Sequence, residues 1–188
     1  MTVKRVGIVG SGIMGSGIAE VAAKAGFEVV LRSRAQSTAD AMVAGLEKSL
    51  AKQVERGKLD APERDAVLGR VRAVTDLHEL GECDLVLESI VEDLAAKKHL
   101  FNELDRICPE HTILATNTST LPVVEMAMET GRPDKVCGIH FFNPAPMMTL
   151  VEVVRAITSS AATVDEAVAF AAACVRSPIC TSCRNAIS

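Results

Sequence analysis

The chain has no Trp and no Tyr, and aromatic residues make up only 3% of its 188 residues. Its core is therefore predicted to be aliphatic, within a hydrophobic fraction of 48%. No apolar run reaches the roughly 18 residues of a membrane span, and no signal peptide is recognisable. A net charge of -4 leaves no basic excess, so neither nucleic acid nor a membrane is predicted as a partner. Local cations and helix N-termini can still bind an anionic ligand.

The chain has six cysteines but no export signal, which indicates free thiols in a reducing cytoplasm rather than disulfides. Cys83, Cys108 and Cys137 stand in apolar stretches or at element ends, where small thiols usually pack in the core. Cys180 and Cys183 form a Cys-x-x-Cys pair, but a second ligand pair for zinc is missing. No strand-to-helix context surrounds the pair, so a redox dithiol is not predicted either. We expect a cytoplasmic protein without a metal site.

Short aliphatic and β-branched runs alternate with helical patterns along most of the chain. Strands are predicted at residues 6–9, 29–31, 71–74, 85–88, 113–115 and 136–140. Helices are predicted at about residues 13–22, 35–56, from 62 onward and at 94–107. Continuous apolar strands that alternate with helices predict a mainly parallel sheet covered on both faces. The helical pair after the second strand is an insertion, and such insertions usually carry substrate contacts.

A glycine-rich turn joins the first predicted strand to the first helix. Gly10, Gly12 and Gly15 have the spacing Gly-x-Gly-x-x-Gly, in the strand–turn–helix context that a dinucleotide requires. Gly10 permits the tight turn, Gly12 lets a pyrophosphate approach the backbone, and Gly15 lets the helix pack on the strand. The intervening residues of the turn are predicted to contact the cofactor too, namely Ser11, Ile13 and Met14. Together with the strand order, the motif predicts a Rossmann-type, doubly wound α/β domain.

The end of the second predicted strand departs from the usual pattern. An acidic residue is expected about 20 positions after the glycines, where it holds the ribose hydroxyls of NAD. This chain has Arg32, Ser33 and Arg34 there instead. The two arginines suit a 2′-phosphate, which favours NADP. Alternatively, both arginines are solvated and Ser33 holds NAD. The sequence leaves NAD and NADP open.

His140 and Glu152 are the candidate catalytic pair. A histidine can accept a proton near neutral pH, and a carboxylate can fix its tautomer and stabilise the charged ring. By spacing alone, a histidine at the end of an apolar strand is more often a satisfied core residue, and Glu152 is equally an ordinary strand carboxylate. A base on the same chain as a dinucleotide motif points to a dehydrogenase.

Four motifs of this chain together resemble one enzyme family. They are Gly10 to Ala19 (GSGIMGSGIA), Glu88 to Asp93 (ESIVED), Thr116 to Ser119 (TNTS) and His140 to Pro144 (HFFNP). Over about residues 3–173 the chain resembles the N-terminal domain of the short-chain L-3-hydroxyacyl-CoA dehydrogenases. The resemblance implies an acyl-CoA substrate and a nicotinamide cofactor.

The resemblance also implies roles for individual residues. His140 would be the general base that takes the 3-hydroxyl proton, Glu152 would hold its imidazole, and Ser119 would hydrogen-bond the substrate oxygen. Cofactor contacts are implied for Glu92, Lys97, Asn117 and Asn143. Ser49 would contact coenzyme A, and Arg56 stands where the family often has lysine, able to pair with a phosphate. Lys97 and Lys98 could instead form one exposed helix face, and three other histidines are expected to be solvated: His78, His99 and His111.

The last fifteen residues, 174–188, contain three of the six cysteines and do not resemble the family. We expect an atypical tail there, from a frameshift or truncation, after a dinucleotide-binding domain at 1–173. The resemblance implies a further helical domain that forms a homodimer and completes the active site, and this sequence does not contain it. Dimerisation is therefore doubtful, and we expect nucleotide binding with little turnover.

Three functions remain in competition. The first is NAD(P)-dependent oxidation of 3-hydroxyacyl-CoA in fatty-acid or butanoate metabolism. The second is a catalytically dead module that binds nucleotide and coenzyme A. The third is a dehydrogenase of free β-hydroxyacids, which shares the glycine-rich opening but generally relies on a catalytic lysine outside its first domain.

Overall fold

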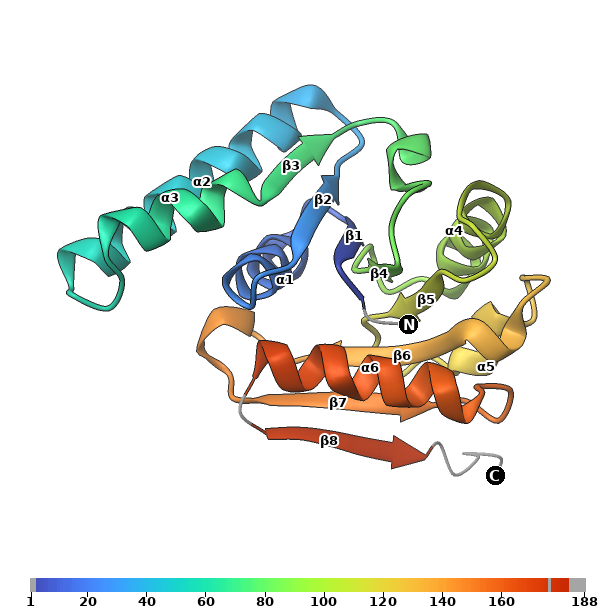
Figure 1. Ribbon diagram of the computed structural model, residues 1–188. Coiled ribbons are helices and arrows are strands. Elements are labelled where there is room, and N and C mark those ends of the chain that lie inside the picture. Colours follow the sequence, from blue (N-terminus) through green and yellow to red (C-terminus); the bar gives the residue numbers. More distant parts are fainter. Residues whose placement is uncertain (1–2, 176, 183–188) are drawn as a thin grey trace.

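One eight-stranded sheet organises the molecule in the computed structural model, which describes residues 3–175 and 177–182 (Figure 1). The strand order is β3-β2-β1-β4-β5-β6-β7-β8. Six strands are parallel, whereas β7 is antiparallel to β6, and β8 runs parallel to β7. The strands are β1 (Arg5–Val9), β2 (Glu28–Arg32), β3 (Val71–Val74), β4 (Leu85–Glu88), β5 (Ile113–Thr116), β6 (Val136–Phe141), β7 (Leu150–Arg155) and β8 (Ser177–Ser182). The predicted mainly parallel α/β sheet is confirmed.

Helices cover both faces of the sheet. They are α1 (Ile13–Lys24), α2 (Gln36–Glu55), α3 (Ala61–Gly69), α4 (Leu94–Ile107), α5 (Val123–Ala127) and α6 (Ala161–Cys174), with short 3₁₀ turns η1 (Leu77–Leu80), η2 (Pro133–Lys135) and η3 (Ala145–Met147). Ile8 of β1 packs in the core beneath α1 and α6, whereas its neighbour Val9 packs in the core beneath α4 and α5. Because successive strand residues point to opposite faces, continuously apolar strands are needed to fill both cores.

Local signals in the sequence set several helix ends. Asp60 and Glu63 form a reciprocal capping box at the start of α3, with a proline in its first turn. The side chain of Asp93 accepts the amide N–H of Ala96 and so caps α4. Gly26 follows the last turn of α1 with a φ of 97°, which favours glycine.

The predicted helical insertion after the second strand is confirmed as α2 and α3. The two helices lie against each other and lead into β3, which adds to the edge of the sheet beside β2 (Figure 1). Glu20 of α1 is buried at the base of this insertion. Its carboxylate accepts hydrogen bonds from Ser49 at 2.8 Å and Gln53 at 2.8 Å, both on α2. The insertion is thereby tied to the helix that follows the glycine turn.

The segment predicted as an atypical tail continues the fold in its first part. Cys174 is the last residue of α6, and Ser177–Ser182 add β8 to the edge of the sheet beside β7. The mixed polar sequence of this segment has no strand alternation, so only the pairing with β7 reveals the strand. Cys183 and the rest of the predicted tail, 183–188, lie outside the described residues.

The three cysteines predicted to pack in the core are buried. Burial raises the pKa of the Cys83 and Cys137 thiols to about 12, and that of Cys108 to about 11. These thiols are therefore protonated at neutral pH and unreactive. Across the part of the chain that the structure describes, no helix combines the length and apolar character needed to cross a membrane.

Candidate active site

A cleft of about 970 Å³ lies where the carboxyl ends of the parallel strands meet the glycine turn. This edge of an open α/β sheet is where such folds bind ligands. The predicted residues that line it come from five loops, namely Gly10, Ser11, Gly12, Ile13, Met14, Arg32, Ser33, Arg34, Glu92, Asn117, Ser119, His140 and Asn143. Residues more than 130 positions apart in the sequence thus line one cleft.

The glycine turn has the space that a dinucleotide pyrophosphate needs. Gly10 has a φ of 131°, and a Cβ there would overlap the carbonyl oxygen of Ser89. A Cβ at Gly15 would overlap the carbonyl oxygen of Gly10. Gly12 differs, because a Cβ there would meet no atom within 4 Å, although Gly12 lines the cleft. Gly10 and Gly15 are therefore required by the fold, whereas the bare backbone of Gly12 leaves a cradle open to a ligand.

His140 is held between Glu152 and Ser119. Antiparallel pairing of β6 with β7 places His140 directly opposite Glu152, and Nδ1 lies 3.0 Å from the carboxylate Oε2. On the other side of the ring, Nε2 lies 2.9 Å from the hydroxyl oxygen of Ser119. The carboxylate can only accept, so Nδ1 carries the proton and Nε2 is the free acceptor. The structure thus brings the three predicted catalytic residues into contact, with the imidazole between the carboxylate and the hydroxyl, as a general base requires.

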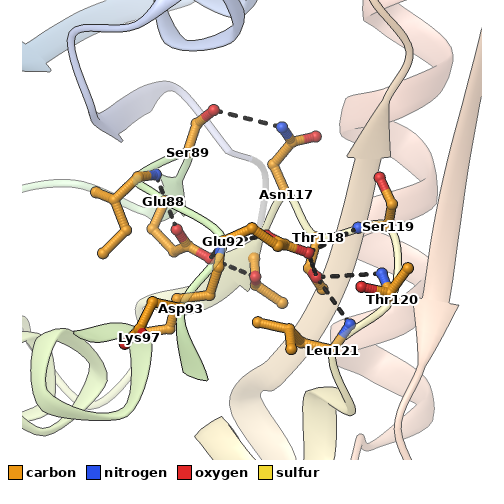
Figure 2. Close-up of polar contacts among 12 residues, drawn as sticks. Glu88, Ser89, Glu92, Asp93, Lys97, Asn117, Thr118, Ser119, Thr120 and Leu121 are labelled. Carbon is orange, nitrogen blue, oxygen red and sulfur yellow. Dashed lines mark hydrogen bonds and ion pairs between the residues drawn. The ribbon is translucent and has the colours of Figure 1, made fainter. Parts of the chain in front are cut away.

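The loop that carries Ser119 is held in place by an ion network around the buried Lys97 (Figure 2). Lys97 of α4 is completely buried, and its Nζ lies 2.6 Å from Glu88 and 3.2 Å from Glu92. Glu92 in turn accepts the Thr118 hydroxyl and, at 3.3 Å, the amide N–H of Ser119. Desolvation alone would raise the pKa of Glu92, but the Thr118 hydroxyl and the Lys97 charge outweigh it and lower the pKa.

Lys97 is the main correction to the predicted site. A direct contact with the cofactor was implied for it, yet its side chain has no exposed surface and does not line the cleft. The alternative of an exposed helix face is also wrong for Lys97, although it holds for Lys98, whose ammonium pairs at the surface with Glu125 and Glu129. Lys97 reaches the cleft only through Glu92. The sequence could not separate two adjacent lysines, because their faces depend on the packing of α4.

Asn117 lines the cleft and also forms hydrogen bonds with residues at the ends of the neighbouring strands. Its side-chain oxygen accepts the amide N–H of Phe141 at 2.8 Å, and its nitrogen donates to the hydroxyl of Ser89 at 3.3 Å. These bonds join the ends of β4, β5 and β6 at the floor of the cleft. Asn143 is exposed on the rim.

The two residues predicted to contact coenzyme A lie at different places on α2. Ser49 lines a second groove of about 400 Å³ that shares Ser11, Gly12 and Ile13 with the main cleft. Its hydroxyl donates to Glu20, which the sequence reasoning missed. Arg56 follows the last residue of α2, is exposed, and lines neither opening. The structure therefore brings Ser49 to the site but leaves Arg56 apart from it.

Sequence reasoning also missed Glu88 and Thr118. Glu88 ends a fully buried strand, and its carboxylate accepts from Lys97, from the Thr116 hydroxyl and from the amide N–H of Ile90. For Glu88 the sequence offered one signal, a carboxylate at the end of an apolar strand. Thr118 stands inside the TNTS motif, but the resemblance gave it no role of its own.

The three remaining histidines are exposed as predicted, and each lies near a carboxylate: His78, His99 and His111. Among the described residues, no group of three or more His, Cys, Asp or Glu side chains is arranged to hold a metal ion.

Comparison with known proteins identifies the family of this site. Residues 5–184 match the family model described as "3-hydroxyacyl-CoA dehydrogenase, NAD binding domain". The chain belongs to this family. Its glycine turn, its cleft and its His140–Glu152 pair are therefore features of a 3-hydroxyacyl-CoA dehydrogenase NAD-binding domain.

Individual relatives agree with this assignment. A probable 3-hydroxybutyryl-CoA dehydrogenase of Bacillus subtilis is 45% identical over 171 residues, covering 91% of this chain and 60% of the relative. The 3-hydroxybutyryl-CoA dehydrogenase of Clostridioides difficile is 46% identical, covering 86% and 57%. The crystal structure of a 3-hydroxybutyryl-CoA dehydrogenase from Escherichia coli aligns with a TM-score of 0.94 at 40% identity, covering 97% of this chain and 39% of that one. The chain thus spans about 60% of the length of the Bacillus relative.

Proposed function

We propose that this chain carries the nucleotide site and the proton-transfer residues of a 3-hydroxyacyl-CoA dehydrogenase. The reaction is the reversible, NAD- or NADP-dependent oxidation of an (S)-3-hydroxyacyl-CoA, such as 3-hydroxybutyryl-CoA, to the 3-oxoacyl-CoA, in fatty-acid or butanoate metabolism. The observation that carries the proposal is the Glu152–His140–Ser119 array at the end of the dinucleotide cleft. Relatives of similar sequence are named for this activity.

The geometry supports a proton path through His140. Its Nε2 accepts the Ser119 hydroxyl at 2.9 Å, and with substrate bound this lone pair takes the proton of the substrate 3-hydroxyl while the Ser119 hydroxyl turns to the same oxygen. Glu152 stabilises the imidazolium that forms, because it accepts the remaining Nδ1–H at 3.0 Å. The Ser119 hydroxyl is a donor to the oxygen that becomes the carbonyl. A bound nicotinamide supplies the acceptor for the hydrogen and electron pair leaving carbon 3.

The groove beside α2 is the proposed path for the acyl-CoA chain. It joins the cleft at Ser11, Gly12 and Ile13 and runs along Ser49. Arg56 remains a candidate for a terminal phosphate contact, because it is an exposed cation at the end of the same helix. Homodimer formation remains a prediction.

A nucleotide- and CoA-binding module without turnover is the second candidate. A dehydrogenase of free β-hydroxyacids is the third, and the CoA-ester names of the relatives weigh against it.

A turnover experiment separates the three. With enzyme in excess over 3-hydroxybutyryl-CoA and either oxidised dinucleotide, we expect slow formation of reduced dinucleotide, measured by absorbance. His140→Gln is expected to reduce the rate about 10²- to 10⁴-fold, whereas the exposed His99→Gln leaves it unchanged. Binding without any turnover would favour the second candidate, and faster reaction with free 3-hydroxybutyrate the third.

A further inference from the structure

The rim of the cleft at the end of β2 has an unusual charge for a site that binds NAD. A ribose with two free hydroxyls is normally held there by a carboxylate. Among the described residues that line this cleft, the only carboxylate is Glu92, which comes from the loop after β4. The end of β2 presents two guanidinium groups instead, from Arg32 and Arg34.

Ser33 does not provide a substitute for the missing carboxylate. Although it stands at the expected position, it is only 1% exposed, and its hydroxyl is hydrogen-bonded to the hydroxyl of Thr38. Thr38 in turn donates to the carbonyl oxygen of Ala35 at 2.8 Å. These two hydrogen bonds link the end of β2 to the first turn of α2. Since Thr38 donates to Ala35, the Ser33 hydroxyl donates its proton to Thr38, and the burial of Ser33 leaves its oxygen poorly accessible to a ribose.

The two arginines are both available to bind an anion, but they differ in burial and in how they are held. Arg32 is half-buried and anchored, because its Nε donates to the carbonyl oxygen of Thr75 at 3.2 Å, which leaves its terminal nitrogens for another partner. Arg34 is exposed and makes no hydrogen bond or ion pair with any described residue. The nearby carboxylate of Asp76 accepts the amide N–H and the ring Nδ1 of His78, and it does not line the cleft. Asp76 is close enough to Arg32 to interact with its charge, whereas Arg34 has no carboxylate partner among the described residues.

We infer that Arg32 and Arg34 form a binding site for the 2′-phosphate of NADP(H), which makes this phosphorylated dinucleotide the preferred cofactor. The inference rests on the proposed dinucleotide site and adds the choice of cofactor. A 2′-phosphate monoester carries close to two negative charges at neutral pH, and planar guanidinium groups bind such a group bidentately. An unphosphorylated ribose would leave the Arg34 guanidinium without a counter-charge and would find no accessible acceptor on the buried Ser33.

A binding titration of this polypeptide tests the site without depending on turnover. We expect NADPH to bind about tenfold or more tightly than NADH, as one charged hydrogen-bond set contributes at least that factor. The fragments 2′,5′-ADP and 5′-AMP should show the same order. The NADPH affinity should also fall more steeply with added salt, since the extra contact is between charges.

Arg34→Ala assigns the preference to a residue. It should weaken NADPH about tenfold and change NADH less than about twofold. Arg106→Ala is the matched control, because it removes another exposed arginine far from the cleft, and it should change neither affinity. Folding is not at risk in Arg34→Ala, as the side chain makes no contact that the fold needs.

Three outcomes would overturn the inference. Equal or tighter binding of NADH by the unmodified chain would show that the arginines are bystanders. An NADPH preference that survives Arg34→Ala would place the phosphate elsewhere. In either case the proposed dehydrogenase reaction would stand with its cofactor unchanged or reassigned. Failure of both dinucleotides to bind would remove the inference and the proposed function together.

Discussion

At the scale of single residues, the three glycines of the Gly-x-Gly-x-x-Gly motif have different roles. Gly10 and Gly15 lack room for a side chain because backbone carbonyl oxygens occupy the space. Gly12 has room on every side and yet borders the cleft. The same residue type therefore serves the fold at two positions and leaves space for the ligand at the third.

Substituting two of these glycines should separate stability from binding. Gly12→Ala is expected to cost about 1 kcal/mol or less in unfolding free energy, while weakening dinucleotide binding at least about tenfold, since the added methyl enters the cradle. Gly15→Ala is expected to cost about 3 kcal/mol or more, because the new Cβ overlaps the carbonyl oxygen of Gly10. Urea denaturation and NADPH titration of both variants provide the two readouts. A Gly12→Ala variant that binds normally would contradict this assignment.

At the scale of elements, the proposed catalytic pair depends on one antiparallel strand pairing in an otherwise parallel sheet. Residues 140 and 152 become neighbours because β7 turns back along β6.

The insertion formed by α2 and α3 is attached to α1 through the carboxylate of Glu20. This carboxylate is only 4% exposed and pairs with Lys24 of its own helix, 2.7 Å away, as well as with Ser49 and Gln53 of α2.

The pH dependence of stability should report on Glu20. Burial alone would raise its pKa, but the bonds from Lys24 and Gln53 outweigh burial and lower the pKa below 4.5. A carboxyl group with a depressed folded-state pKa stabilises the protein above about pH 4.5, and this contribution is lost as the pH falls through the folded value. Glu20→Gln should therefore cost about 1–3 kcal/mol at pH 7, and its difference from the parent should shrink in acid.

Denaturation of parent and variant at pH 7 and near pH 3.5 measures this difference. Glu47→Gln, an exposed glutamate on α2, is the control and should change stability by less than about 0.5 kcal/mol. A loss of equal size at both pH values would mean that the charge of Glu20 is irrelevant and only its shape matters.

At the scale of the whole molecule, the cleft joins elements from both halves of the parallel sheet. Its lining residues come from the ends of β1, β2, β4, β5 and β6, and the bonds of Asn117 link the last three of these strand ends. A ligand that occupies the cleft therefore binds the folded chain and has no equivalent site in the unfolded one.

Thermal unfolding should accordingly respond to dinucleotide. At a concentration of 100 times Kd, the ligand stabilises the folded state by about 2.7 kcal/mol, which for a chain of this size raises Tm by about 5–10 °C. His140→Gln should show the same shift, because the base is not needed for binding. Scanning calorimetry with and without NADPH checks this, and an unchanged Tm at saturating ligand would mean that the cleft does not bind it.

Local patterns in the sequence were sufficient for the elements and for the main chemistry. Apolar runs, capping residues and the spacing of Gly10, Gly12 and Gly15 act over a few positions, so they can be recognised without knowing the fold. Strands β1 to β6, the helical insertion and the glycine turn were predicted in this way, whereas α5, α6 and β8 were not. The pairing of His140 with Glu152 was predicted from a motif and its family resemblance.

The burial and the partners of individual side chains depended on the tertiary structure. Lys97 turned out to be buried under Glu92, Ser33 to be engaged by Thr38, and Glu20 to connect two helices. The direction of each of these side chains depends on how its helix or strand packs, and the sequence pattern around it does not record that. A local pattern states which residue types stand near one another along the chain, whereas burial and partners arise only when the whole sheet brings its loops together.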